Sequence, residues 1–151
     1  MRLTRYSDIG LRVLMYLARE SRTPAVTVGE VSGQFDIPHN HLVKVVGAMA
    51  KLGWIDALRG RNGGISLAVP AKSLRIGDVL QALEGSGEAI DCDGLGCQLA
   101  ADCGLRHALR SGMQAFYAAM NRYTLADIAS GGTGEQIVRM HRSFLGRSVQ
   151  V

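Results

Sequence analysis

The sequence predicts a mainly α-helical protein with one small β-hairpin, and three observations support this fold class. Apolar residues recur at helical spacing along several segments of the chain. Only one short stretch, between residues 54 and 69, has the pattern of two paired strands. The length of 151 residues suits one compact domain, or a small domain with an extension, and the apolar content is sufficient for a hydrophobic core.

Three helices are expected in the N-terminal third of the chain. The first covers about Thr4–Ala18, with apolar residues on one face. The second covers Thr27–Phe35, where Thr27 followed by Glu30 forms a capping-box pattern. The third covers His39–Leu52, and Gly53 follows it where a left-handed cap is expected. The apolar stripe of this third helix comprises Leu42, Val45, Val46, Met49 and Leu52.

Two short strands, Trp54–Leu58 and Ile65–Val69, follow the third helix. The turn between them, RGRNGG, contains the asparagine and glycines that tight hairpins need for positive φ angles. A helix, a helix–turn–helix pair and a basic hairpin, in this order, are the elements of a winged helix-turn-helix domain. We therefore assign residues 1–70 to a DNA-binding domain of this kind.

Residues 71–130 form a second region. We expect a helix over Ile76–Gly85, a loop that contains cysteines, a long helix from about Leu105 to Tyr123 and a short helix over Thr124–Ser130. The long helix carries an apolar stripe that is too hydrophobic to face water, and we predict that it forms the interface of a homodimer. The interface residues are Leu105, Leu109, Met113, Phe116 and Met120. Residues 131–151 are expected to be a flexible polar and basic tail.

Charged residues are unevenly distributed, which favours a nucleic-acid partner for the first region. Up to position 61 there are nine basic and five acidic residues, whereas the stretch between Gly85 and Gly104 has four acidic residues and no basic one. On the third helix, polar residues off the apolar stripe are concentrated near the N-terminal end, which recognition helices present to the major groove. A solvated helix face would look similar, but two arginines in the hairpin turn favour DNA binding. The predicted contacts are Asn40, His41, Lys44, Arg59 and Arg61.

All three cysteines, Cys92, Cys97 and Cys103, lie in one short acidic and glycine-containing loop. We expect a cytoplasmic protein, because no signal-peptide layout and no apolar run of about 18–20 residues is present. Thiols stay reduced in the cytoplasm, so metal binding is favoured over disulfides. The wide C-x4-C-x5-C spacing suits an iron–sulfur cluster better than a zinc knuckle.

The loop supplies three sulfur atoms, and a fourth ligand must come from an oxygen or a nitrogen atom. Nearby candidates are Asp91, Asp93, Asp102 and His107, of which His107 lies one helical turn after Cys103. No arrangement of a nucleophile and a base, no phosphate loop and no second metal motif is found, so we do not expect an enzyme. The contrasting class is a zinc protein or an iron–sulfur protein without a regulatory role.

Four segments together resemble a known family. They are MRLTRYSDIGLRVLMYLA, RGRNGGISLA, IGDVLQALEG and the three-cysteine loop, and the likeness extends over residues 1–130. They are similar to the winged-helix regulators of the Rrf-two type, and most similar to the nitric-oxide-sensing repressors among them. A branch of the same family that regulates iron–sulfur biogenesis has C-x5-C-x5-C, with a histidine three residues after the last cysteine. This chain has x4 in the first gap, and His107 lies four residues after Cys103.

The resemblance implies a homodimeric repressor that binds a palindromic operator while a [4Fe–4S] cluster, or alternatively a [2Fe–2S] cluster, is bound. Nitric oxide would be the signal. The resemblance also implies that Asp8 of the partner subunit supplies the fourth ligand, with His107 as the alternative. Without the resemblance, Asp8 would be taken as a first-turn acid favoured by the helix dipole. The alternative function is a general iron–sulfur or redox-sensing regulator.

Overall fold

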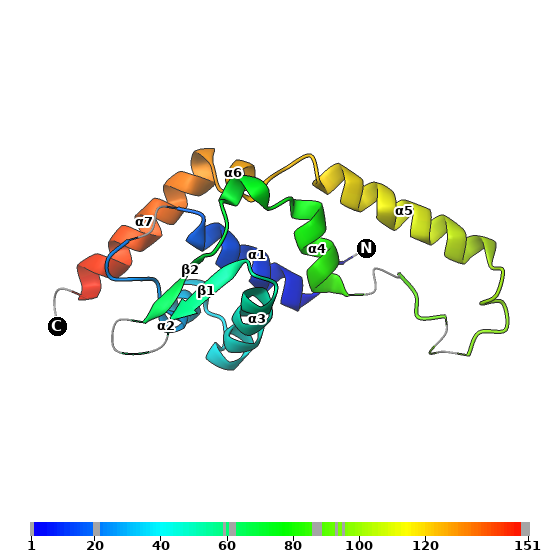
Figure 1. Ribbon diagram of the computed structural model, residues 1–151, viewed down its shortest axis with the longest axis horizontal. Helices are drawn as coiled ribbons and strands as arrows, with labels where there is room; N and C mark the ends of the chain where they lie inside the picture. The colour runs from blue at the N-terminus through cyan, green and yellow to red at the C-terminus, as the bar shows by residue number, and fades with distance from the viewer. Residues whose placement is uncertain are drawn as a thin grey trace.

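The protein is described by a computed structural model for residues 2–19, 22–58, 60, 63–85, 89–92, 94 and 96–148. Within these residues the fold is mainly helical with one two-stranded sheet, as predicted. Figure 1 shows a central body from which two helices, α5 (Gly104–Met120) and α7 (Gly131–Ser148), extend in different directions. The cysteine loop lies at the far end of α5, away from α7.

The first two helices, α1 (Arg5–Leu17) and α2 (Val28–Phe35), begin at threonine caps. Thr4 Oγ1 accepts a hydrogen bond from the Ser7 N–H at 3.3 Å. Thr27 Oγ1 accepts one from the Glu30 N–H at 3.1 Å, which confirms half of the predicted capping box. The other half is not formed, because the Glu30 side chain is buried and bonded to other partners.

The third helix, α3 (His39–Lys51), buries the predicted stripe except at its end. Leu52 is 47% exposed, so its assignment to the core was wrong. It is the C-cap residue, and the chain turns there into Gly53, whose φ of 74° is the predicted left-handed conformation. The buried positions of α3 are Leu42, Val45, Val46 and Met49.

Strands β1 (Ile55–Leu58) and β2 (Gly64–Leu67) form the predicted antiparallel hairpin, with Leu58 opposite Gly64. The Ile65 N–H also donates to the Val26 carbonyl at 2.7 Å, which fixes β2 to the segment before α2. A Cβ atom at Gly64 would lie 2.6 Å from this carbonyl oxygen, so the close approach requires glycine.

The hydrophobic core lies around α1, which packs against α3 and against α4 (Ile76–Glu84). A short 3-10 turn, η1 (Ala71–Ser73), connects the hairpin to α4, and α6 (Leu125–Ile128) packs beside it. The predicted start of α6 is confirmed, since Thr124 and Asp127 form a complete capping box. The largest fully buried apolar side chains are Tyr16, Leu14, Leu42, Met49, Ile76, Leu80 and Leu125.

The long helix α5 is attached to the body at its C-terminal end. A Cβ atom at Gly77 of α4 would lie 2.1 Å from the Tyr117 carbonyl oxygen, so glycine permits the close contact between the two helices. Next to this contact, the Asn121 side chain accepts from the Asp78 N–H at 2.9 Å and donates to the Asp78 carboxylate at 2.7 Å. Of the α5 side chains, only Tyr117 is buried in the single chain.

The expected flexible tail is instead helix α7 over most of its length, so this prediction was wrong. Ile137 is 4% exposed, and Met140 packs against the core from the same face. The Gln34 side chain of α2 donates to the Met140 carbonyl at 3.2 Å. The glycines and charged residues of this segment give a weak helical pattern in the sequence. The helix is stabilised by packing on α1 and α2 and not by its local sequence. No helix within the described ranges is both long and apolar enough to cross a membrane.

Candidate functional site

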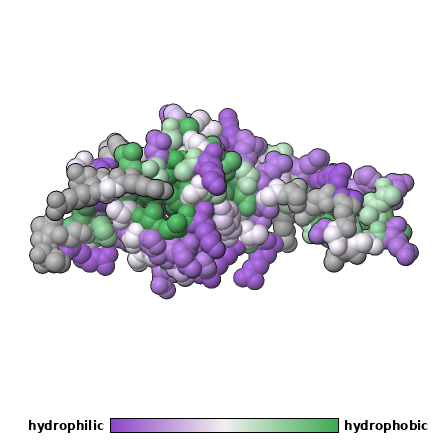
Figure 2. Space-filling view, turned by 60° about the horizontal axis from the view of Figure 1, so that its bottom comes forward, coloured by the Kyte–Doolittle hydropathy of each residue, from purple (hydrophilic) through white to green (hydrophobic). Residues whose placement is uncertain are grey.

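The exposed face of α3 presents the residues predicted to contact DNA. Asn40, His41 and Lys44 are all exposed and lie in the N-terminal half of the helix. The opposite face is anchored in the core through the apolar stripe, so the helix has a fixed orientation. Figure 2 brings the lower side of Figure 1 forward, where α3 lies, and shows many hydrophilic side chains there, with hydrophobic ones in the middle of the molecule. This exposed face is the one predicted to act as a recognition helix.

The hairpin provides the wing beside this helix. The predicted wing residues Arg59 and Arg61 lie outside the described residues. The hairpin that carries them is described on both sides, and the Gly63 N–H donates to the Gly60 carbonyl at 2.9 Å in the turn. Gly60 has a φ of 109°, in line with the positive φ expected for this turn.

The three cysteines line one cavity of about 200 Å³ at the N-terminal end of α5. Cys92 is buried, Cys97 is exposed and Cys103 is half-buried, and none of the three is in a disulfide. The Cys97 N–H donates to the Cys92 carbonyl at 3.1 Å, which folds the first gap into a turn. The remaining lining residues are mostly apolar: Ala89, Ile90, Leu99, Leu105 and Leu109, together with Arg106 and Arg110.

The residues of this cavity are of the kinds that would hold an iron–sulfur cluster. Among the described residues, no three histidine, cysteine or acidic side chains are close enough together to hold one metal ion. The three thiols nevertheless face the same space, whose volume far exceeds the roughly 10–15 Å³ that one water molecule requires. Thiolates are the preferred ligands of iron–sulfur clusters, and an apolar lining excludes water from such a group.

Neither predicted fourth ligand lies among the described residues that line this cavity in the same chain. Asp8 is on the exposed side of the first turn of α1, where its carboxylate pairs with Arg12 at 3.0 Å. His107 is on α5, with its side chain 64% exposed and its Nε2 atom 3.6 Å from the Asp102 carboxylate. Of the other candidates, Asp91 accepts a hydrogen bond from the Gly94 N–H at 2.7 Å, and Asp93 is outside the described residues.

The apolar stripe of α5 has two parts in the structure. Met113, Phe116 and Met120 are half-buried and pack against the core of their own chain. Leu105 and Leu109 lie on the wall of the cysteine cavity, and Leu105 is 61% exposed. The N-terminal half of the predicted interface is therefore a continuation of the cysteine site.

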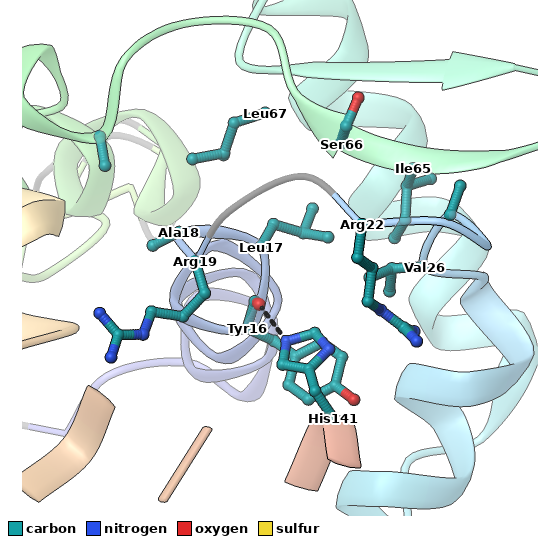
Figure 3. A pocket seen from close by; sticks show the side chains of 12 residues that line it. Tyr16, Leu17, Ala18, Arg19, Arg22, Val26, Ile65, Ser66, Leu67 and His141 are labelled. Atoms are coloured by element: carbon teal, nitrogen blue, oxygen red, sulfur yellow. Dashed lines mark hydrogen bonds between the residues drawn. The ribbon is translucent and has the colours of Figure 1, made fainter. Parts of the chain in front are cut away.

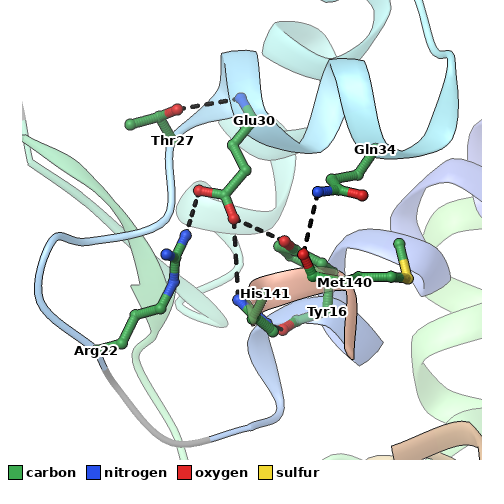
Figure 4. Close-up of polar contacts among 7 residues, drawn as sticks. All are labelled: Tyr16, Arg22, Thr27, Glu30, Gln34, Met140 and His141. Carbon is green, nitrogen blue, oxygen red and sulfur yellow. Dashed lines mark hydrogen bonds and ion pairs between the residues drawn. The ribbon is translucent and has the colours of Figure 1, made fainter. Parts of the chain in front are cut away.

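A buried polar cluster formed by Tyr16, Arg22, Glu30 and His141 joins α7 to the helix–turn–helix, and sequence reasoning missed it. Figure 4 shows Glu30 at its centre. The Tyr16 hydroxyl donates to Glu30 at 2.6 Å, and the Arg22 guanidinium forms an ion pair with the same carboxylate. The His141 ring stacks on Tyr16 at 4.0 Å between centroids, and its Nε2 lies 3.0 Å from the Tyr16 carbonyl oxygen. No sequence signal connects these residues, since Tyr16, Arg22 and Glu30 come from α1, α2 and the segment between them, whereas His141 lies far away in the chain on α7.

The environment of this cluster shifts the ionisation of two of its members. Burial, followed by the hydrogen bond to Glu30, raises the pKa of Tyr16 well above its ordinary value. Burial also lowers the pKa of His141, and the nearby Arg22 adds to this effect, while the Tyr16 carbonyl and Glu30 oppose it. Tyr16 therefore acts as a neutral donor to a carboxylate, and the fold favours a neutral His141.

Three solved structures have the same fold. CymR of Staphylococcus aureus in its oxidized form matches with a TM-score of 0.66 and 23% identity, over 87% of this chain and 98% of that chain. T. potens IscR matches with a TM-score of 0.66 and 19% identity, over 85% of each chain. CymR (YrzC) of B. subtilis, titled the global cysteine regulator, matches with a TM-score of 0.65 and 20% identity, over 85% of this chain and 96% of that chain.

The family comparison covers most of the chain. Residues 3–131 match the Rrf2 family, which is described as "Iron-dependent Transcriptional regulator". The match includes the winged helix-turn-helix, the cysteine loop and α5, and it ends where α7 begins. Members of this family are DNA-binding regulators, typically dimeric, and not enzymes. The chain belongs to the Rrf2 family of transcriptional regulators.

Proposed function

We propose that this regulator is a homodimeric repressor of the NsrR type, which binds its operator while a [4Fe–4S] cluster is bound and releases it when nitric oxide reacts with the cluster. The observation that carries the proposal is the apolar cavity lined by all three cysteines. Membership of a family described as iron-dependent adds to it. The spacing of the cysteines distinguishes the chain from the IscR pattern of x5 and x5.

Each residue of the site has a distinct proposed part. Cys92, Cys97 and Cys103 would hold three irons through thiolate sulfur, and the apolar wall would exclude water. The bound cluster would supply an iron with a weaker oxygen ligand that nitric oxide can reach. Asp8 of the partner subunit would be that ligand, through the Oδ2 atom or, if its ion pair with Arg12 opens, through the Oδ1 atom as well. Because both partners of this pair are about half exposed, little energy opposes the opening.

In the winged helix-turn-helix region, the proposed roles are contacts with DNA. His41 and Asn40 would contact base edges in the major groove, and Lys44 would contact a guanine or a phosphate. Arg59 and Arg61 would reach the minor groove or its phosphates from the wing. Replacing both wing arginines with alanine should weaken operator binding and reduce its salt dependence by about one unit of slope per lost phosphate contact. Unchanged affinity and slope would contradict the wing assignment.

The decisive experiment is anaerobic purification followed by absorption and Mössbauer spectroscopy and by operator titration, before and after addition of nitric oxide. A brown [4Fe–4S] protein that binds the operator tightly, and that loses both colour and DNA affinity with nitric oxide, is the expected result. A colourless protein that contains only zinc would contradict the cofactor assignment. A [2Fe–2S] protein that responds to redox potential and not to nitric oxide would favour the general iron–sulfur or redox regulator.

The fourth ligand is tested separately by substitutions in the same protein. Cys92→Ala, Cys97→Ala and Cys103→Ala should each prevent stable cluster binding, because only two thiolates would remain. Asp8→Ala should retain the cluster and lower operator affinity, whereas His107→Ala should leave both nearly unchanged. An inert Asp8 together with an essential His107 would show that the ligand comes from the loop's own helix, and would refute the link between subunits.

A further inference from the structure

A cavity of about 390 Å³ lies at the end of α1 opposite to Asp8. Its walls come from five parts of the chain: the end of α1, the segment before α2, strand β2 of the wing, the start of η1, and α7. Figure 3 shows Arg19 and Arg22 on either side of the stacked Tyr16 and His141 rings. The volume is within the range of about 300–1,000 Å³ that is typical of small-molecule sites. Neither the cysteines nor the exposed face of α3 contributes to it.

The charges around this cavity favour an anion. Two arginines line it, and no acidic side chain does so among the described residues. Arg19 is exposed and has no hydrogen bond or ion pair within the described structure. Arg22 pairs with Glu30, which lies behind the wall, through one nitrogen only. Among the described residues the net charge at the cavity is therefore positive, because Arg22 has an acidic partner and Arg19 has none.

Unsatisfied polar atoms are concentrated on the same wall. Nε and Nη1 of Arg22 and Nδ1 of His141 are buried and have no hydrogen-bond partner among the described residues. Nδ1 of His141 lies 3.9 Å from Glu30, beyond hydrogen-bond length. Buried polar atoms without partners are costly. The two Arg22 nitrogens are donors that a ligand could satisfy, whereas Nδ1 of His141 is an acceptor when Nε2 donates to the Tyr16 carbonyl. Bulk water does not reach these atoms, so a group inside the cavity would satisfy the Arg22 donors once the guanidinium turned toward it.

The rest of the lining is apolar. It includes Leu17, Val26, Ile65 and Leu67, with the Ser66 hydroxyl as an additional polar group. A free phosphate or sulfate ion would leave this apolar surface without a partner. An anion with a compact hydrocarbon body matches both parts of the wall.

We infer that this cavity binds a small organic carboxylate, with its carboxylate between Arg19 and Arg22 and its hydrocarbon body against Leu17, Ile65 and Leu67. The site is independent of the proposed cluster chemistry. Because β2 and α7 both form walls, an occupant would hold the wing against α1 and the C-terminal helix. Single-ring or short branched carboxylates are of the appropriate size.

The test uses the full chain and titrates benzoate, with benzamide as the neutral compound of the same shape, by calorimetry and by amide chemical shifts in NMR spectra. Benzoate should bind with one site per chain and shift the amides of Ile65, Ser66 and Leu67, and benzamide should bind at least about tenfold more weakly. No saturable benzoate binding at millimolar concentration, or equal binding of benzamide, would overturn the inference.

Substitutions localise the binding. Arg19→Gln changes an exposed residue and should leave the fold intact while weakening benzoate binding about tenfold, the value of one charge-assisted hydrogen bond. Arg22→Gln should weaken it further, and its thermal unfolding shows whether the fold survives the loss of the Glu30 partner. Arg142→Gln is the matched control, since this exposed arginine follows His141 on α7 and does not line the cavity. Benzoate affinity that is the same in Arg19→Gln and Arg142→Gln would place the binding elsewhere and refute the assignment.

Discussion

Tyr16→Phe is the smallest change that tests whether the buried cluster holds α7 and the helix–turn–helix together. It removes one hydroxyl and keeps the ring that stacks on His141. The lost hydrogen bond is short, at 2.6 Å, and both partners are buried, with Tyr16 0% and Glu30 3% exposed. A hydrogen bond to a charged group contributes about 1.5–3 kcal/mol, and water cannot replace it at this depth. We therefore expect the free energy of unfolding to fall by about 1.5–3 kcal/mol.

The assay is chemical and thermal unfolding followed by circular dichroism at one fixed protein concentration, because dimerisation makes stability depend on concentration. For a domain of this size the expected loss corresponds to a decrease in Tm of about 3–12 °C. Tyr123→Phe is the matched control, since Tyr123 is 51% exposed, and it should change stability by less than about 0.5 kcal/mol.

A double-mutant cycle with Glu30→Gln separates the hydrogen bond from other effects of the two substitutions. The two residues contact each other directly, so we expect a coupling free energy of about 0.5–3 kcal/mol. Equal stability of Tyr16→Phe and Tyr123→Phe, or a coupling close to zero, would refute the reasoning. The cluster would then be an arrangement without energetic importance, and α7 would be held by apolar contacts alone.

Three further predictions concern pH, packing and assembly. The pKa of His141 is lowered in the fold, so its contribution to stability is fully present above its ordinary pKa of 6.5 and is lost as the pH falls below that value. Chemical denaturation from about pH 7 to about pH 5 should therefore show a steeper loss of stability in the wild type than in His141→Gln. Equal slopes would contradict this prediction. Gly77→Ala should destabilise the chain by about 1–3 kcal/mol in chemical denaturation, because the new Cβ would lie 2.1 Å from the Tyr117 carbonyl oxygen. Gly112→Ala is the control, since a Cβ atom there meets no neighbour within 4 Å. A loss of stability no larger than that of Gly112→Ala would argue against a tight contact at Gly77. Leu109→Glu on the outer half of α5 should shift the protein towards monomer in light scattering, and an unchanged dimer would remove this half of the helix from the interface.

Local sequence patterns were sufficient to predict the secondary structure of most of the winged helix-turn-helix region. The boundaries of α1, α2 and α3 follow from helical periodicity and from caps that act within a few residues, as Thr4, Thr27 and Gly53 show. The hairpin is equally local, because its turn and strands are contiguous. The cysteines could be grouped from sequence for the same reason, since a single loop and the first turns of α5 bring them to one cavity.

Features that depend on distant parts of the chain could not be predicted in this way. Glu30 fits the pattern of a capping box, but the burial of its carboxylate is set by Tyr16 and Arg22 from other segments. The helical state of α7 depends on its contacts with α1 and α2, where His141 stacks on Tyr16 and Gln34 donates to the Met140 carbonyl. The cavity of about 390 Å³ has the same origin, because five separate segments form its walls. A single sequence contains no pattern that records such contacts.

Helix α1 extends from Asp8, the proposed ligand of the partner subunit's cluster, to the cavity of about 390 Å³. Asp8 lies in its first turn, and Tyr16 lies at its end, next to the large cavity. The side chains between them, Val13 and Leu14, are completely buried, so the helix is fixed in the core and cannot bend freely. Helix α1 is also in direct contact with α3, so a displacement of either end of α1 would act on α3. A change at Asp8 could therefore reach the predicted recognition helix through α1. An occupant of the cavity of about 390 Å³ could act on the same helix from the other end of α1.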